Sequence, residues 1–250
     1  MKKEIRNHLG EGLDFHLTEG SSPEAPWFVL GHGVTANKDR EWAKLLSEAL
    51  GQRGWNALRF SFSGNGDSEG DFRESCPSKE VEDLGAVLDA VGRPVTYIGH
   101  SMGAVVGVLR AQRDPRILRL VSLGGMVDTR AFDERKFGSL TPDEGFMWDI
   151  PSCPYSSTFK KDMQEIGTVL PLASQIRLPW LLVHGTEDTV VPFEESLAIS
   201  KEAAGPVELI PIEGGDHVFS GAAGPLMVEK VMLWLQEQDK QGQDKSSEQS

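Results

Sequence analysis

The sequence predicts an α/β fold, in which a mostly parallel sheet carries helices on both faces. Short apolar runs rich in Val, Ile, Leu and aromatic residues recur along the 250 residues and end in turn residues, as buried strands do. Stretches with helical spacing of apolar residues lie between these runs. Regular alternation of strand and helix is typical of a parallel sheet that is covered on both sides.

Six runs are expected to form the parallel strands, and one earlier segment, Phe15 to Leu17, is expected to add an antiparallel strand at an edge. All six contain several β-branched or aromatic residues and are followed by Gly, Ser, Asn or Asp within a few positions. In chain order they are Trp27 to Leu30, Ala57 to Phe62, Val95 to Ile98, Ile117 to Leu123, Trp180 to His184 and Val207 to Ile212.

Four helices are expected between these strands, because apolar residues recur every three or four positions there. They are Asp39 to Gln52, Lys79 to Val91, Ser101 to Gln112 and Glu194 to Ala203. A final helix should run from about Leu226 to Gln236. Residues 238–250 contain no apolar residue, so they are expected to form a disordered polar tail behind a single domain that spans residues 1–237.

Residues 129–178 interrupt the alternation. This interval contains four prolines and scattered aromatic residues, with one helix-like piece near Thr158 to Ile166. An unstructured connection of that length would be unusual in a compact domain. The interval is therefore expected to fold as an inserted cap over the edge of the sheet, with Phe146, Trp148 and Phe159 as candidate substrate-binding residues.

Composition excludes several classes of function. Acidic residues outnumber basic ones by 38 to 25, and the formal charge of −13 disfavours nucleic acid and anionic lipid as partners. The two cysteines lie far apart without a Cys/His cluster, so we expect reduced thiols, no zinc and no cofactor. No apolar run reaches the length of a membrane span, which indicates a cytoplasmic protein. The oligomeric state is not predicted.

The pattern Gly-x-Ser-x-Gly occurs twice, around Ser68 and around Ser101, so its context must identify a nucleophile. A nucleophile elbow needs a strand before the serine and a helix after it. Ser101 follows the expected strand Val95 to Ile98 and begins an expected helix. Ser68 is followed by a polar loop, so it is interpreted as part of a glycine-rich turn.

A serine hydroxyl becomes an effective nucleophile when an imidazole accepts its proton and a carboxylate orients that imidazole. His217 lies in a Gly-Gly-Asp-His loop after the last expected strand, and Asp188 follows the strand before it. Ser101, Asp188 and His217 thus occur in the chain order Ser, acid, His that this chemistry shows in α/β enzymes. Glu187 and Asp128 remain alternative acids.

Two backbone N–H groups are candidates for stabilising the oxyanion of an acyl-transfer reaction. One belongs to Met102, directly after the nucleophile, and the other to Val34, in the Gly31-His32-Gly33-Val34 loop after the first parallel strand. The alternative is that this loop only turns the chain.

Five motifs in order resemble those of the α/β-hydrolase superfamily: HGVTANK, FSGNGDSEG, GHSMG, HGTEDTVVP and GGDHVF. Within it the chain is most similar to bacterial feruloyl and cinnamoyl esterases and to serine aminopeptidase-like hydrolases. The resemblance extends to about Gln236. It implies the α/β-hydrolase fold with an inserted cap at about 129–178, triad roles for Ser101, Asp188 and His217, and oxyanion roles for Val34 and Met102.

The expected function is therefore hydrolysis of a small carboxylic ester through an acyl-enzyme intermediate, without metal or cofactor. A peptidase or a thioesterase would use the same mechanism, and a non-catalytic ligand-binding module would keep the same pocket. An intact set of Ser, His and acid argues against the last alternative.

Overall fold

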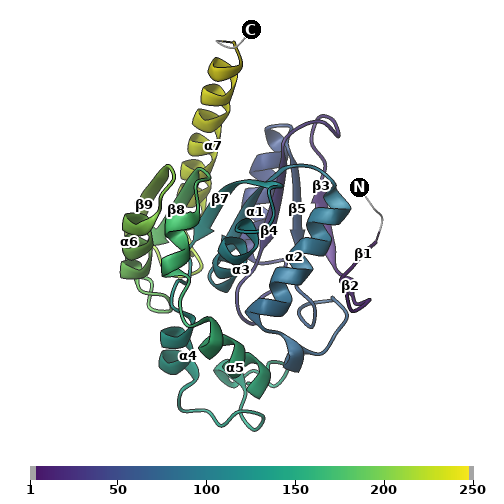
Figure 1. The fold of residues 1–250 in the computed structure, drawn as a ribbon, viewed down its shortest axis with the longest axis vertical. Helices are drawn as coiled ribbons and strands as arrows, with labels where there is room; N and C mark the ends of the chain where they lie inside the picture. Colours follow the sequence, from purple (N-terminus) through teal and green to yellow (C-terminus); the bar gives the residue numbers. More distant parts are fainter. Residues whose placement is uncertain (1–3, 248–250) are drawn as a thin grey trace.

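The computed structural model describes residues 4–247, and its centre is a seven-stranded sheet (Figure 1). Six strands run parallel and the edge strand β3 is antiparallel to β5, so both the fold class and the antiparallel edge are confirmed. In spatial order the strands are β3 (Phe15–Thr18), β5 (Asn56–Phe60), β4 (Trp27–Gly31), β6 (Val95–His100), β7 (Ile117–Leu123), β8 (Trp180–Gly185) and β9 (Val207–Ile212).

Helices cover both faces of the sheet, and this explains why the central strands are buried from end to end rather than alternating. One face packs on α1 (Glu41–Gln52) and α7 (Ala223–Ser247), through side chains such as Leu46 and Val231. The other face packs on α2, α3 and α6, through side chains such as Leu84, Val105 and Ile199. These helices span Pro77–Val91, Met102–Ala111 and Phe193–Glu202.

Two features at the chain ends differ from the expectation. A short hairpin, β1 (Ile5–Arg6) with β2 (Gly12–Leu13), precedes the sheet. At the other end, α7 continues to Ser247, so the prediction of a disordered tail from residue 238 is wrong for residues 238–247. That stretch has no proline and consists mainly of Gln, Asp and Lys, which permit a helix even without an apolar face. Residues 248–250 of the predicted tail lie outside the described residues.

The 129–178 segment contains two α-helices, α4 (Thr129–Phe137) and α5 (Ser157–Ile166), and two 3-10 turns, at Met147–Asp149 and Leu170–Gln175. Only α5 was expected. The α4 sequence is mostly charged and shows little apolar periodicity, but Asp128 caps its first turn by accepting a hydrogen bond from Ala131 N at 2.7 Å. Figure 1 shows α4 and α5 together beyond one end of the sheet, opposite the end from which α7 projects.

Within the described range, 4–247, we find no helix that combines the length and the apolar character needed to cross a membrane.

Candidate active site

Ser101 lies in a sharp turn between β6 and α3. Its φ is 55° and its ψ is −121°, a strained conformation for a residue with a side chain. The flanking glycines make the turn possible: a Cβ atom on Gly99 would lie 2.3 Å from the Gly103 oxygen, and one on Gly103 would lie 2.6 Å from the Gly31 oxygen. The turn therefore has the strand, strain and small neighbours of a nucleophile elbow.

Ser68, the second serine in a Gly-x-Ser-x-Gly pattern, has a different environment. Its hydroxyl donates to the Ser61 carbonyl at 2.7 Å and accepts from Asp14 N at 2.8 Å. Both bonds stabilise the turn between β5 and α2, so Ser68 is structural, as its sequence context indicated.

His217 and Asp188 come from the loops after β9 and β8, and they form a hydrogen bond of 2.7 Å between Nδ1 and Oδ2. Because an ionised carboxylate can only accept, Nδ1 of His217 carries the hydrogen and Nε2 is left with a lone pair. Ser101 and His217 line the same pocket. Within the described residues their side chains are not hydrogen-bonded to each other; such contacts often tighten only when substrate binds.

The Asp188 side chain is inaccessible to solvent and every oxygen is used. Oδ1 accepts from Val190 N and Val191 N, both at 2.8 Å, and Oδ2 lies 3.2 Å from His184 Nε2. Burial alone would raise the pKa of Asp188, but the hydrogen bonds from His184 and His217 lower it below its usual range, and so does the positive charge of His217 whenever that imidazole is protonated. This carboxylate therefore stays ionised.

The two alternative acids lie elsewhere. Asp128 is occupied in capping α4, and the Glu187 residue is exposed to solvent. Of the three candidates, only Asp188 forms a hydrogen bond with His217 in the described chain.

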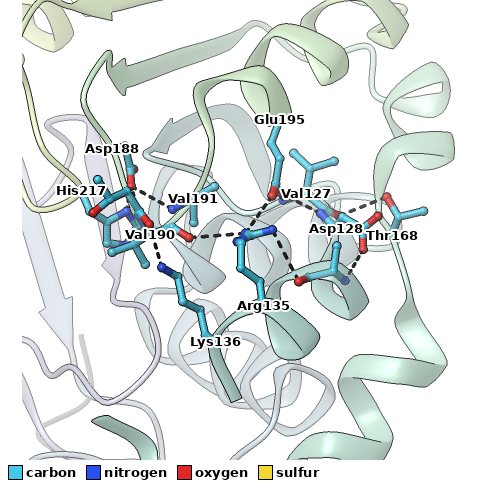
Figure 2. Close-up of polar contacts among 12 residues, drawn as sticks. Val127, Asp128, Arg135, Lys136, Thr168, Asp188, Val190, Val191, Glu195 and His217 are labelled. Atoms are coloured by element: carbon cyan, nitrogen blue, oxygen red, sulfur yellow. Dashed lines mark hydrogen bonds and ion pairs between the residues drawn. The ribbon is translucent and has the colours of Figure 1, made fainter. Parts of the chain in front are cut away.

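Helix α4 of the 129–178 segment binds the loop that carries Asp188 (Figure 2). Lys136 Nζ donates to the Thr189 carbonyl at 2.7 Å, and Arg135 contacts both the Val190 carbonyl, at 3.4 Å, and Glu195, at 3.3 Å. Glu195 in turn accepts hydrogen bonds from the backbone just before α4. The start of this segment is thus tied to the acid loop, a link that local sequence did not reveal.

The loop after β4 passes directly beside Ser101, because a Cβ atom on Gly33 would lie 2.7 Å from Ser101 Cβ. His32 holds this loop: its Nε2 accepts from Phe62 N at 3.0 Å, so Nδ1 carries the hydrogen and donates to the Gly33 carbonyl at 2.8 Å. That bond sets the plane of the peptide whose N–H belongs to Val34. Neither Val34 N nor Met102 N donates to another group within the described residues.

His100 is hydrogen-bonded to the backbone of His217. Its Nε2 donates to the His217 carbonyl at 2.8 Å, its ring stacks on Trp42 with centroids 5.2 Å apart, and burial lowers its pKa to about 3. From the sequence, no role was assigned to His32 or His100. Their positions directly before Gly33 and Ser101 were the available signal.

A cavity of about 230 Å³ opens beside Ser101, and most of its wall is apolar. Among the three expected substrate-binding residues, only Trp148 lines it. Phe146 is exposed outside the cavity, and Phe159 packs inside the 129–178 segment against Phe137 and Tyr155, so neither of these two residues lines the cavity. The lining residues are Gly33, Val34, Thr35, Ala36, Arg40, Trp42, His100, Ser101, Trp148, Ile150, Val190, His217 and Val218.

Among residues 4–247, no group of three or more His, Cys, Asp or Glu side chains is arranged to hold a metal ion. The groups gathered at the cavity instead suit acyl transfer, since they offer a hydroxyl, an imidazole held by a carboxylate and two unused backbone donors.

Known proteins share sequence and fold with this chain. The family model described as "Alpha/beta hydrolase family" matches residues 28–226. The mitochondrial palmitoyl-protein thioesterase ABHD10 of Mus musculus is 26% identical over 204 residues, which cover 74% of this chain and 64% of that protein. The uncharacterized protein YfhR of Salmonella typhimurium is 27% identical over 229 residues, covering 82% and 69%.

Among solved structures, that of Est1E from Butyrivibrio proteoclasticus with ferulic acid bound superposes with a TM-score of 0.87 at 24% identity, covering 96% of this chain and all of that one (100%). The mouse ABHD10 structure superposes with a TM-score of 0.77 at 21% identity, covering 94% and 98%. These structural similarities establish the fold.

Proposed function

We propose that this chain, which belongs to the alpha/beta hydrolase family, hydrolyses carboxylic esters with Ser101 as nucleophile, His217 as general base and Asp188 as the orienting acid. The observation that carries the proposal is the 2.7 Å hydrogen bond that His217 Nδ1 donates to the buried carboxylate of Asp188, beside a serine held at a φ of 55°. These are the parts of a serine hydrolase site, contributed by three separate loops.

The reaction would proceed in two halves. His217 Nε2 takes the hydroxyl proton of Ser101 as the oxygen attacks the ester carbonyl, and the same imidazolium then protonates the departing alcohol. Water repeats the sequence on the acyl-enzyme and releases the acid. Asp188 remains ionised throughout and stabilises the imidazolium through Nδ1.

The developing oxyanion would be bound by the N–H groups of Val34 and Met102. The Met102 amide lies in the first turn of α3, where the helix dipole favours negative charge. The Val34 amide is aimed by the bond from His32 to the Gly33 carbonyl. Preorganised donors of this kind commonly account for the largest part of acyl-transfer catalysis.

The substrate is proposed to be a small ester, because the cavity beside Ser101 is small, about 230 Å³, and its wall is mainly apolar. Est1E was solved with ferulic acid, an aromatic acid, which is compatible with this class. A thioester is the second candidate, since the mouse relative is named a palmitoyl-protein thioesterase. Purified protein should be compared on aryl ester, thioester and aminoacyl anilide substrates of the same acyl group. Fastest turnover of the anilide would make the protein a peptidase instead.

The 129–178 segment is proposed to act as a cap that selects the acyl group through Trp148. We expect Trp148→Ala to change kcat/KM unequally across esters of increasing acyl length, because removing the indole enlarges the cavity on one side. Phe146→Ala is the matched control, since Phe146 has similar exposure but lies outside the cavity. If both variants shift all esters by the same factor, or follow only the melting temperature, the cap has no role in selection.

The proposed base also predicts a pH dependence. Burial lowers the pKa of His32 to about 4 and that of His100 to about 3, so both stay neutral between about pH 5 and 8. Neither of them can then contribute an ionisation to the kcat/KM profile in that window, so a rise of kcat/KM with pH there would report the general base that accepts the proton of Ser101. Measurement with an ester whose acylation limits the rate checks this. A flat profile would argue against a histidine base.

We also propose that the protein works in the cytoplasm. Cys76 and Cys153 are both buried free thiols, which fits a reducing compartment, and burial raises the pKa of Cys76 to about 12, so that thiol is unreactive. Retention of both thiols on isolation from cells without reductant would support this placement.

A further inference from the structure

Arg40 stands at the mouth of the cavity that contains Ser101. It immediately precedes α1, is exposed, and is the one lining residue of this cavity with a permanent charge. The rest of the wall consists of apolar groups, neutral polar groups and the imidazoles of His100 and His217. A guanidinium cannot be neutralised at working pH, so any substrate in the cavity meets a fixed positive charge.

No carboxylate of the described chain lies within ion-pair distance of Arg40. Its guanidinium donates to the Thr35 carbonyl at 3.2 Å, which leaves further N–H donors unused. The neighbouring Asp39 pairs with Lys38 and with Arg59 instead. In a chain whose formal charge is −13, acidic partners are abundant, so an arginine that faces the reaction site without one is notable.

The charge of Arg40 acts across the site. Burial is the main reason that the pKa values of His32 and His100 are low, and the positive charge of Arg40 lowers both further. His32 positions the Val34 amide, and His100 binds the His217 carbonyl. The positive charge of Arg40 therefore acts on the imidazoles that surround Ser101.

A second groove, of about 420 Å³, begins where the cavity ends. The two share Arg40, Trp42 and Val218, and the groove continues over the first turns of α1 and the loop before α7. Its further lining residues are Glu41, Leu45, Phe219, Ser220, Gly221 and Pro225. Trp42 is buried, and its indole N–H has no partner within the described residues. Arg40 thus marks the border between two mainly apolar spaces.

We propose that the natural ester carries a negatively charged group, a carboxylate or a phosphate, which Arg40 binds at this border, with an apolar arm that continues into the second groove. This inference rests on the proposed esterase function and names its substrate class. An anion complements the guanidinium donors that no protein group uses and gains from their fixed fork geometry, whereas a neutral ester offers no charge-assisted hydrogen bond in place of water.

The test compares pairs of esters in which one terminal group is either charged or neutral. In the first pair, mono-4-nitrophenyl suberate carries a negative charge on its acyl group and 4-nitrophenyl octanoate does not. In the second pair, 4-acetoxybenzoate carries the charge on its leaving group and 4-acetoxybenzamide does not. The wild type should prefer the charged member of at least one pair at low salt, and salt should reduce that preference. Inhibition by benzoate and by phenyl phosphate distinguishes the two kinds of anion.

Arg40→Gln should lower the ratio of kcat/KM for the charged ester over its neutral partner by about tenfold, the usual scale of a hydrogen bond to a charged group. Arg40→Lys should retain part of the ratio. Lys44→Gln is the matched control, because Lys44 is an exposed cation one turn further along α1 and lines neither space; it should leave the ratio unchanged.

The outcomes distinguish a failure of this inference from a failure of the proposed function. If neutral and charged esters are hydrolysed equally, or Arg40→Gln and Lys44→Gln change the ratio alike, Arg40 binds no substrate anion while esterase activity stands. If no ester of either charge is hydrolysed, the proposed function fails as well.

Discussion

Replacing Ser101 with alanine should abolish ester turnover and leave the fold intact. The change removes one oxygen from a residue whose φ of 55° is held by the surrounding strand, helix and glycines, so no cavity opens in the core. Loss of the corresponding serine in a well-studied protease costs about 10⁶ in kcat, and we expect a loss of that order. Steady-state kinetics and the melting temperature measure the two effects independently.

Ser68→Ala provides the control for this prediction, because it carries the same change in the other Gly-x-Ser-x-Gly pattern. A fluorophosphonate should label the wild type and Ser68→Ala at Ser101, identified by peptide mass. The Ser68 hydroxyl bridges Ser61 and Asp14, so its loss should lower stability slightly and not kcat. Labelling at Ser68, or wild-type turnover by Ser101→Ala, would remove Ser101 from the mechanism.

Asp188→Asn should lower kcat by about 10⁴, as the equivalent change does in the protease triad. The carboxylate accepts from His217 Nδ1 and from two backbone amides at once. An amide has one acceptor oxygen, so either the imidazole tautomer or the loop geometry is lost. The variant should still bind a substrate-like inhibitor with nearly unchanged affinity, because Asp188 does not line the cavity.

Asp128→Asn tests the alternative acid in the same assay. Asparagine also caps helices well, so this variant should retain kcat, while Asp128→Ala should lose about 1 kcal/mol of stability through the missing cap on α4. Lys136→Met, which removes only the bond to the Thr189 carbonyl, should give a kcat loss far smaller than that of Asp188→Asn. A greater loss in Asp128→Asn than in Asp188→Asn would transfer the acid role.

Much of the fold follows from local sequence. Buried parallel strands need continuous apolar runs, and amphipathic helices need a period of 3.6 residues, so β4 to β9 and the four helices between them were visible as patterns. The elbow at Ser101 was equally visible, because its glycines, strand and helix are adjacent in the chain. The same patterns did not predict α4 or the end of α7, because these two segments lack an apolar stripe.

By itself the sequence determined the α/β class, the elbow serine and the chain order in which an acid and a histidine follow it, because each is a local or sequential property. Tertiary structure decided which acid meets His217, which residue of the 129–178 segment reaches the cavity, and that His32, His100 and Lys136 hold the loops around it. Helical spacing marked Phe159 as apolar but could not tell whether it faced a cavity or packed against Phe137. The reason is physical: hydrogen bonds and packing between loops far apart in the chain depend on distances that no local pattern encodes.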